Sequence, residues 1–422
     1  MQQKKTFHRG WRMPFVCMIM VAATSLFSTG MSTNLNAIKT IYHLSGTLSS
    51  TIVTIRSVSA FLVMLAADRY FEKFGVRCGT AAAMLIGVLG FVLFAVGNGN
   101  IFIYYLAAAL GGITYSYGLM LPSSILLNKW FNQHRGLAFS IASAGTGLCS
   151  VIGAPVIQTL IERYDLKTAF LAQAAFLLAV SLMLLLVVVN DPAEVSAEPV
   201  GGAGYMPEKK KSAGAGKRTE ALPKHWVALL VLVTTMIGAS TSPASAHLTL
   251  NFTTNGFDAM TVAKAVSVYG VTLILAKLLC GWVNDRLGAV KTIYIYGTVL
   301  AVGKTLCWLT MYRSGIPFLF VTMIFYGAGV PVETLGYPNW CADLTIPQNY
   351  TKVLSRLQTG YQLGALLASS VPGIIYDATG YYSWYYLGCA VTEILALGIV
   401  LAAYRRFVPG KKKKQADGSK KL

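Results

Sequence analysis

Charged side chains are scarce in this 422-residue chain: Asp, Glu, Lys and Arg together make up 12% of it, about half of the ~25% usual in soluble proteins. Hydrophobic residues make up 55%, without counting the 40 glycines. So few charges cannot keep that much apolar surface in water. The composition therefore excludes a soluble globular enzyme and, outside short polar stretches, a disordered chain.

Acidic residues are the scarcer of the two signs, with 16 Asp and Glu against 35 Lys and Arg. An excess of positive charge would suit nucleic acid, but here the basic residues lie in short runs between long apolar stretches. Membrane proteins collect Lys and Arg on the cytoplasmic side of the bilayer. We therefore expect the lipid bilayer as a partner and no nucleic acid.

Paired cysteines and catalytic motifs are also missing. The seven cysteines are scattered, with no Cys-x-x-Cys pair, which argues against a disulfide framework and a zinc site. There is no Walker loop, no Gly-x-Ser-x-Gly and no His-Glu-x-x-His motif. We expect a protein that is not an enzyme, with no catalytic residues, metal or cofactor.

Long apolar runs dominate what is present. A membrane-spanning helix needs about 20 apolar residues, and the first such run is too long for the core of a signal peptide. We therefore expect an all-α membrane protein with twelve transmembrane helices, all retained. The predicted spans are about 13–35, 48–68, 78–97, 101–127, 136–159, 168–189, 225–251, 263–284, 291–312, 317–341, 353–376 and 382–404.

A Pro-, Gly-, Ala- and Lys-rich stretch separates the sixth span from the seventh and is typical of a flexible linker. The predicted organisation is an N-terminal six-helix bundle (1–189), a cytoplasmic linker (190–224), a C-terminal six-helix bundle (225–404) and a basic cytoplasmic tail (405–422). One constant offset matches Asn34 with Asn251, Asp68-Arg69 with Asp285-Arg286, Gly112 with Gly329, Arg135 with Lys352, Gly147 with Gly364, and Pro155 with Pro372. Two parallel six-span repeats describe the major facilitator architecture.

The distribution of positive charge predicts the orientation. With the N-terminus inside, only five of the 35 Lys and Arg residues lie in the outer loops: Lys39, Arg163, Lys167, Lys264 and Arg313. Three more, Arg56, Lys277 and Lys304, fall within spans. The positive-inside rule then places both termini and the linker in the cytoplasm of a cell carrying this protein in its cytoplasmic membrane.

Two loops carry a repeated motif. The loop after the eighth span reads Gly281-Trp-Val-Asn-Asp285-Arg286-Leu-Gly288-Ala-Val-Lys291, and a looser copy after the second span reads Asp68-Arg69-Tyr-Phe-Glu-Lys-Phe-Gly75-Val-Arg77. These segments resemble the major facilitator loop signature Gly-x-x-x-Asp-Arg-x-Gly-x-x-Lys/Arg. The resemblance implies a conformational latch made by Asp68, Arg69, Asp285, Arg286 and Arg135. The alternative is ordinary charge at helix ends.

A second motif points to one branch of that superfamily. Trp130-Phe131-Asn-Gln-His-Arg135-Gly136-Leu137-Ala138 is followed by Gly145-x-Gly147 and Pro155. The run resembles the oxalate/formate antiporter and monocarboxylate transporter branch. The acidic-Gly motif of the monocarboxylate transporters is absent near the first span, where Asn34 lies instead. The resemblance implies transport of small organic anions by alternating access.

Lys277 is the leading candidate for the anion site, because ionisable residues within the membrane are costly and usually face a cavity or a partner. The oxalate/formate branch has a substrate-binding Arg at the same spacing before its loop motif, so the resemblance implies a cation here. Lys offers a point charge in place of the planar fork of Arg. The alternative is a permanent ion pair with Glu333.

The branch also has a Lys in its eleventh span, but the matching stretch here, Leu357 to Leu363, contains no cation. We therefore expect a substrate with a single carboxylate rather than two. Arg56 would supply a second charge if it faces the cavity. Lys304 and Glu393 lie in spans that the superfamily places outside the cavity, so we expect them to snorkel or to pair near helix ends.

Several polar residues complete the predicted site. His247 and Asn251 are one helical turn apart on one face, and Asn34 is the repeat counterpart of Asn251. They would bind substrate or, in the alternative, join helices to one another. The remaining candidates for substrate contact are Tyr117, Tyr361 and Gln362. Glu333 and His247 are the candidates for proton coupling.

The predicted function is a secondary active transporter of small organic anions, with monocarboxylates favoured, that works by anion exchange or proton coupling. One alternative is an exporter of amphipathic cations or drugs, with Glu333 as the ligand. Another is a membrane sensor that keeps the fold and transports nothing. We expect a monomer. The Lys-rich tail is a candidate for contact with anionic lipid, and the alternative is an ordinary tail that obeys the positive-inside rule.

Overall fold

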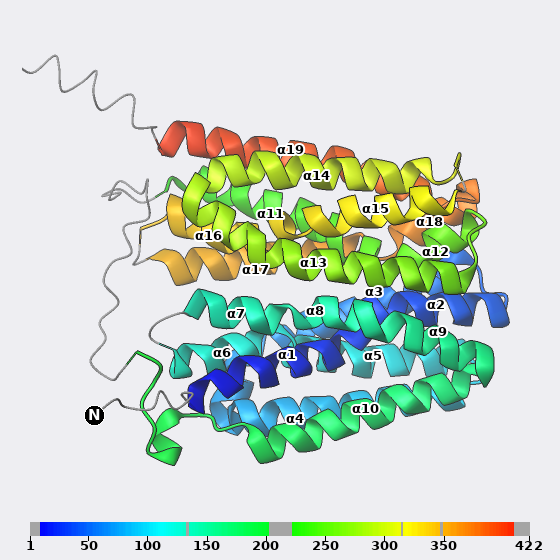
Figure 1. The fold of residues 1–422 in the computed structure, drawn as a ribbon, viewed down its shortest axis with the longest axis horizontal. Helices are drawn as coiled ribbons and strands as arrows, with labels where there is room; N and C mark the ends of the chain where they lie inside the picture. Colours follow the sequence, from blue (N-terminus) through cyan, green and yellow to red (C-terminus); the bar gives the residue numbers. More distant parts are fainter. Residues whose placement is uncertain (1–8, 132–134, 202–221, 314, 347–348, 409–422) are drawn as a thin grey trace, which may run out of the picture. The chain divides into compact units, whose positions relative to one another are not determined.

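The computed structural model describes residues 9–131, 135–201, 222–313, 315–346 and 349–408. The described residues form helices joined by short loops, with one isolated bridge between Phe131 and Val200. They divide into two compact units, residues 1–208 with 258–270 and residues 209–257 with 271–422. Figure 1 labels the helices of both.

The first unit is built from helices that pack along their length. Close packing joins α10 to α4, α4 to α5, and α5 to α3. Side-chain caps begin several of these helices: Ser45 accepts from the Leu48 N–H, Asn100 from Phe102 and Asp165 from Thr168. Its elements are α1 (Arg12–Thr24), α2 (Thr29–Ile41), α3 (Gly46–Met64), α4 (Ala67–Val96), α5 (Ile101–Gly118), α6 (Met120–Trp130), α7 (Arg135–Ser143), α8 (Gly145–Leu148), α9 (Ala154–Arg163) and α10 (Leu166–Val187), with short helical turns η1 (Arg9–Trp11), η2 (Ser25–Phe27), η3 (Cys149–Gly153) and η4 (Pro192–Val195).

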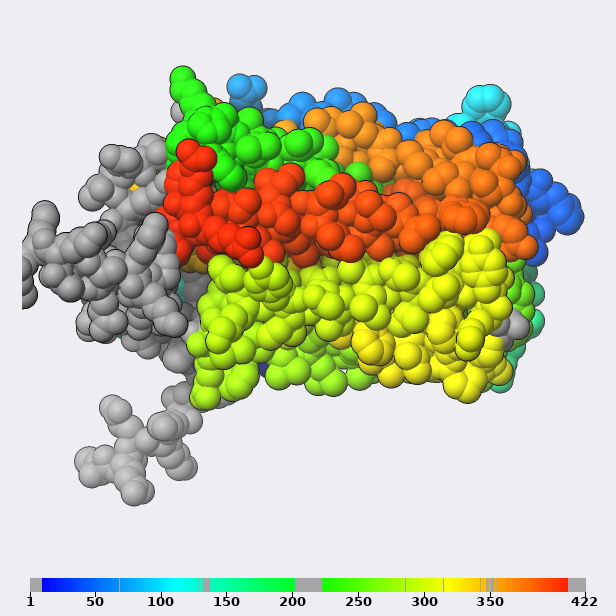
Figure 2. Space-filling view, turned by 90° about the horizontal axis from the view of Figure 1, so that it is seen from above, coloured from blue at the N-terminus to red at the C-terminus, as the bar shows by residue number. Residues whose placement is uncertain are grey.

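The second unit is packed in the same manner. Helix α11 packs against α17 and α19, and α14 against α15 and α19; Figure 2 shows α19, in red, lying along α14. Its elements are α11 (Lys224–Ala246), α12 (Leu248–Thr254), α13 (Ala259–Leu287), α14 (Ala289–Leu309), α15 (Ile316–Gly329), α16 (Pro331–Leu344), α17 (Tyr350–Leu367), α18 (Val371–Thr379) and α19 (Ser383–Phe407). The first residues of α13, up to 270, group with the first unit.

Ten stretches among the described residues are long and apolar enough to cross a membrane. They correspond to the predicted spans except the fourth (101–127) and the eleventh (353–376). Each of these two is a pair of consecutive helices, α5 with α6 and α17 with α18.

Helix breaks are concentrated in particular spans. The first, fourth, fifth, seventh, tenth and eleventh predicted spans each consist of two or more helical pieces, whereas the other six are single helices through the membrane region. In the seventh, Pro243 lies within α11, which ends three residues later, before His247. Broken membrane helices are tolerated where protein or a cavity takes up the freed backbone groups.

The two copies of the loop motif share one backbone conformation. Gly75 has φ 66° and ψ 172°, and Gly288 has φ 82° and ψ 161°. Glycine reaches this region without the steric cost that a side chain imposes. Both glycines end one helical segment and begin the next, so the motif turns the chain in the same way in each half.

Candidate functional site

Lys277 lies on α13 with only 3% of its surface exposed. A buried ammonium loses its hydration and is stabilised only by polar or charged groups brought to it. The structure does not place Glu333 in that role, because Glu333 has its ion pair with Lys304. The alternative of a permanent Lys277–Glu333 pair is therefore wrong for this structure.

Tyr361, on α17, is stacked on Tyr337 of α16, with ring centroids 6.1 Å apart and an interplanar angle of 29°. Tyr361 and Gln362 are both partly exposed. The backbone of Tyr361 also lies against Gly238 of α11, where no side chain would fit. The predicted substrate residue Tyr361 is thus brought together with Tyr337 in the second unit, on helices of the broken tenth and eleventh spans.

Tyr117 lies in the first unit and does not share that stack. Its hydroxyl donates to the Val63 carbonyl over 2.6 Å, and its ring is stacked on Tyr70 at 4.3 Å. These contacts hold the end of α5 against α3 and α4. They give Tyr117 a structural role in helix packing, alongside the predicted substrate contact.

Arg56, on α3, is 3% exposed. Its guanidinium donates to the Phe27 carbonyl at the break between α1 and α2 and lies 5.0 Å from the centre of the Tyr115 ring. A break in a helix leaves carbonyls without their helical donors. Arg56 supplies a charged donor to one of them, which ties the second span to the first.

The repeat-related asparagines are both fully buried and both join helices. Asn34, on α2, exchanges two hydrogen bonds with Gln173 of α10, of 2.9 and 3.1 Å. Asn251, on α12, accepts from Ser383 of α19 over 2.8 Å and donates to the Cys307 carbonyl over 3.3 Å. Each thus connects the first span of its half to the last span of that half.

His247 lies at the break between α11 and α12. Its Nδ1 is 2.9 Å from the Pro243 carbonyl, and its ring lies 5.6 Å from that of Tyr382. The side chain is fully buried. His247 therefore bonds to the Pro243 carbonyl, in the last turn of α11.

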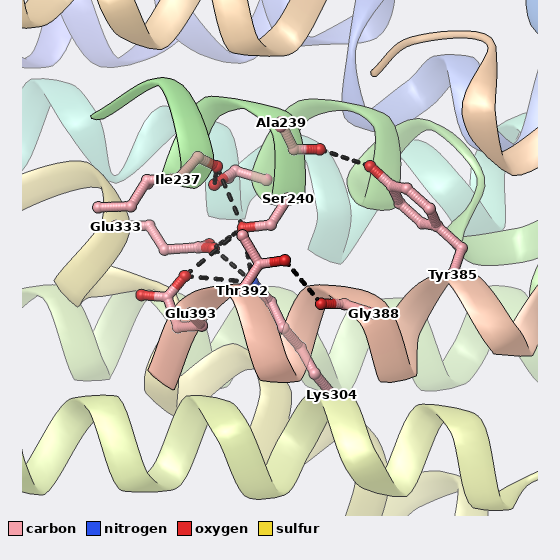
Figure 3. Close-up of polar contacts among 10 residues, drawn as sticks. Ile237, Ala239, Ser240, Lys304, Glu333, Tyr385, Gly388, Thr392 and Glu393 are labelled. Carbon is pink, nitrogen blue, oxygen red and sulfur yellow. Dashed lines mark hydrogen bonds and ion pairs between the residues drawn. The ribbon is translucent and has the colours of Figure 1, made fainter. Parts of the chain in front are cut away.

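The carboxylate–lysine cluster is the densest group of buried charge in the described part of the second unit. It consists of Ser240 on α11, Lys304 on α14, Glu333 on α16 and Glu393 on α19 (Figure 3). Lys304 Nζ lies 2.6 Å from Glu333 Oε1, 3.1 Å from Ser240 Oγ and 3.6 Å from Glu393 Oε2. Ser240 Oγ lies 3.2 Å from Glu333 Oε1 and 3.5 Å from Glu393 Oε2.

This cluster corrects the expectation that Lys304 and Glu393 snorkel or pair near helix ends. Both are buried, with 0% and 1% of their surface exposed, and they meet between helices. The ion pair with Glu333 compensates the charge of the Lys304 ammonium, so this side chain does not need to extend to water. The sequence signal that could have predicted this cluster was the presence of two acids and one base in the ninth, tenth and twelfth spans. Nothing in the sequence singled out Ser240.

The predicted latch is only partly visible. Arg69 and Arg286 are exposed, and Arg286 lies 4.7 Å from the centre of the Trp282 ring. The side chains of Asp68, Asp285 and Arg135 lie outside the described residues. No group of three or more His, Cys, Asp or Glu residues placed to hold a metal ion occurs among those the structure describes.

Comparison with known proteins identifies the family. The model of the Major Facilitator Superfamily matches residues 15–253 and again 226–422. The chain belongs to this superfamily. The all-helical membrane fold and the superfamily resemblance of the loop motifs are thereby confirmed, and the protein is a multi-pass membrane transporter of small molecules, not an enzyme.

Individual relatives are distant. Monocarboxylate transporter 12 of Xenopus laevis is 22% identical over 412 residues, covering 90% of this chain and 87% of that protein. Monocarboxylate transporter 11 of Homo sapiens is 24% identical over 238 residues, 54% of this chain, which span about half (47%) of that protein. The crystal structure of the nucleoside transporter NupG is similar in fold, with a TM-score of 0.68 at 13% identity, covering 94% of this chain and 100% of that one.

Proposed function

We propose that this transporter carries small organic anions bearing a single carboxylate, and that Lys277 is the cation that binds the carboxylate. The burial of Lys277 is the observation that carries the proposal: an ammonium with 3% exposure in an apolar helix is a favourable site for an anion. Two of the distant relatives of this chain are monocarboxylate transporters. The lack of a cation from Leu357 to Leu363 favours one carboxylate over two.

The remaining features of the transporter follow from the sequence pattern. Both termini and the linker lie in the cytoplasm, the membrane is the cytoplasmic membrane, and the working unit is a monomer. The six-span bundles 1–189 and 225–404 alternate in access, with the loop motifs as the latch. The basic tail, which from residue 409 lies outside the described residues, is a candidate for contact with anionic lipid.

Export of cations is the second candidate, and the structure weighs against it. Such a function needs Glu333 as a carboxylate ready to meet a cation. Glu333 instead has Lys304 Nζ 2.6 Å away. A cationic substrate would have to displace a buried ammonium from a buried carboxylate, and breaking one partner from such a pair is costly.

Binding of carboxylates to purified protein tests the proposal. Lys277→Ala should weaken binding of lactate or acetate roughly a hundredfold, because the charged partner of the anion is lost. Lys277→Arg should retain part of the affinity because the charge survives. Lys264→Ala, an exposed lysine on the same helix, is the matched control and should bind as wild type does.

The counter-outcomes are distinct. Wild-type affinity in folded Lys277→Ala would make Lys277 a purely structural residue and would remove the main support for anion transport. Uptake into proteoliposomes separates the classes: flux of carboxylates supports the proposal, flux of amphipathic cations supports the exporter, and no flux of either supports a sensor.

A further inference from the structure

The carboxylate–lysine cluster carries more acid than base. Lys304 contributes one positive charge, and Glu333 and Glu393 contribute two carboxyl groups, at exposures of 0%, 0% and 1%. With every group ionised, the cluster would hold one uncompensated negative charge away from water. Burial of an unpaired charge is among the most costly arrangements in a protein.

The hydrogen-bond donors are also too few for two carboxylates. The three donors of the Lys304 ammonium point to Glu333, Ser240 and, at ion-pair distance, Glu393. Ser240 has one hydroxyl proton, and the Ile237 carbonyl also lies within reach at 3.1 Å. Glu333 Oε2 and Glu393 Oε1 are buried without a hydrogen-bond partner among the described residues. A proton on one carboxyl group would neutralise the cluster and add a donor.

The distances from Lys304 Nζ to the two glutamates indicate which carboxyl group holds the extra proton. Lys304 Nζ is 2.6 Å from Glu333 and 3.6 Å from Glu393, so the ammonium stabilises the charge on Glu333 more strongly. We propose that the cluster is a proton-binding site in which Lys304 and Glu333 form the fixed ion pair and Glu393 holds one proton. The proton enters as a bond to a Glu393 carboxyl oxygen and leaves by breaking that bond, with no other covalent change.

Other titratable groups around the cluster are weak acids. The thiols of Cys307 on α14 and Cys389 on α19 and the phenol of Tyr385 on α19 lie near it. Tyr385 is bonded to the Ala239 carbonyl on α11. Tyr326, on α15, is a further buried phenol beside α14. All of these are neutral in their ordinary state, so they leave the charge count unchanged.

The protonation state of the cluster can affect transport because the cluster lies between four helices. The cluster joins α11, α14, α16 and α19, and two of these, α11 and α16, belong to spans with helix breaks. Loss of the proton leaves a buried negative charge that is relieved only if the helices move apart or water enters. Resting on the proposed anion transport, we assign this site as the point at which pH acts on the transport cycle.

Infrared difference spectroscopy of purified protein in detergent tests the site without any substrate. Wild type should show the C=O stretch of a protonated carboxyl group in a dry environment. Glu393→Gln and Glu333→Gln should each lose that band, because one carboxylate and one ammonium then remain and no extra proton is needed. Glu162→Gln, which removes an exposed glutamate on α9, should leave the band intact.

Lys304→Met provides an independent check, because it should strengthen the infrared band that the two Gln variants should lose. Without the ammonium both carboxyl groups should be protonated, so the band should increase about twofold. A band that survives in either folded Gln variant, or that is absent from wild type, would overturn the proposal.

Transport measurements separate this site from the substrate proposal. In proteoliposomes, the lactate exchange rate of wild type should change severalfold between about pH 6 and pH 8, whereas that of Glu393→Gln should stay flat, and Glu162→Gln should follow wild type. A wild-type pH response in Glu393→Gln would overturn the proposed role in transport. A wild-type protein that shows the infrared band but no lactate binding would keep the proton site and contradict the anion substrate.

Discussion

The buried asparagines that are related by the repeat join helices to one another in this protein. Asn34 and Gln173 illustrate the rule: their amides exchange two hydrogen bonds across α2 and α10, and 0% and 4% of their surfaces are exposed. In a membrane there is little hydrophobic force to hold helices together, so packing and interhelical hydrogen bonds do this work. The same residues are therefore ambiguous as substrate ligands.

Replacement of Asn34 measures this role. Asn34→Ala should lower the free energy of unfolding by roughly 1–2 kcal/mol, because Gln173 is left buried without its partner. Asn34→Ala with Gln173→Leu should recover much of the loss, since both polar groups are then gone. Thermal unfolding of purified protein in detergent gives the comparison.

A role of Asn34 in substrate binding makes a different prediction for Asn34→Ala. If Asn34 binds substrate, Asn34→Ala should keep wild-type stability and lose carboxylate affinity. A fall in affinity without a change in unfolding temperature would therefore assign Asn34 to the substrate site.

Helices of the second unit approach one another closely at glycine. A Cβ built on Gly364 of α17 would lie 1.8 Å from the Thr235 carbonyl oxygen of α11, and one built on Gly238 would lie 1.9 Å from the Tyr361 carbonyl oxygen. These contacts involve backbone atoms, which cannot rotate away as a flexible side chain can. The α11–α17 crossing therefore depends on the absence of a side chain from both helices.

Gly364→Ala should consequently destabilise the protein by about 1–3 kcal/mol through overpacking. Gly388→Ala is the matched control, since a Cβ there on α19 meets nothing within 4 Å; the better helix propensity of Ala should leave stability unchanged or slightly raised. Unfolding temperatures of the two variants in the same detergent make the test. Equal effects at both positions would contradict the close crossing.

At the scale of the whole molecule, the two halves repeat geometry as well as residues. Gly75 and Gly288 adopt the same left-handed turn, and Asn34 and Asn251 each connect the first and last spans of their half. A duplicated bundle places equivalent residues in equivalent positions, so a role found in one half predicts the role of its counterpart.

Membrane orientation is the prediction that belongs to this scale. In a variant with exposed Cys78 replaced by Ser, Ser212→Cys in the linker should resist an impermeant thiol reagent applied to intact cells. Arg313→Cys, in a predicted outer loop, should react. The physical reason is that few of the Lys and Arg residues occupy the outer loops. Labelling of Ser212→Cys from outside would reverse the topology.

Composition and the length of the apolar runs were sufficient to predict the membrane helices. Long apolar runs in a chain with 12% charged residues leave helices in a bilayer as the stable arrangement, because only a helix satisfies every backbone group within one segment. The loop motifs were enough to name the superfamily.

The partners of buried charges were decided by the tertiary structure alone. From the sequence, Lys277 was the possible ion-pair partner of Glu333, whereas helix packing brings Glu333 to Lys304 on α14, together with Glu393 and Ser240. Hydropathy measures whether a helix enters the membrane, a property of that helix by itself. Which face of one helix meets which face of another depends on packing between elements distant in the chain, so the pairing of Lys304 with two acids appears only when α11, α14, α16 and α19 are assembled.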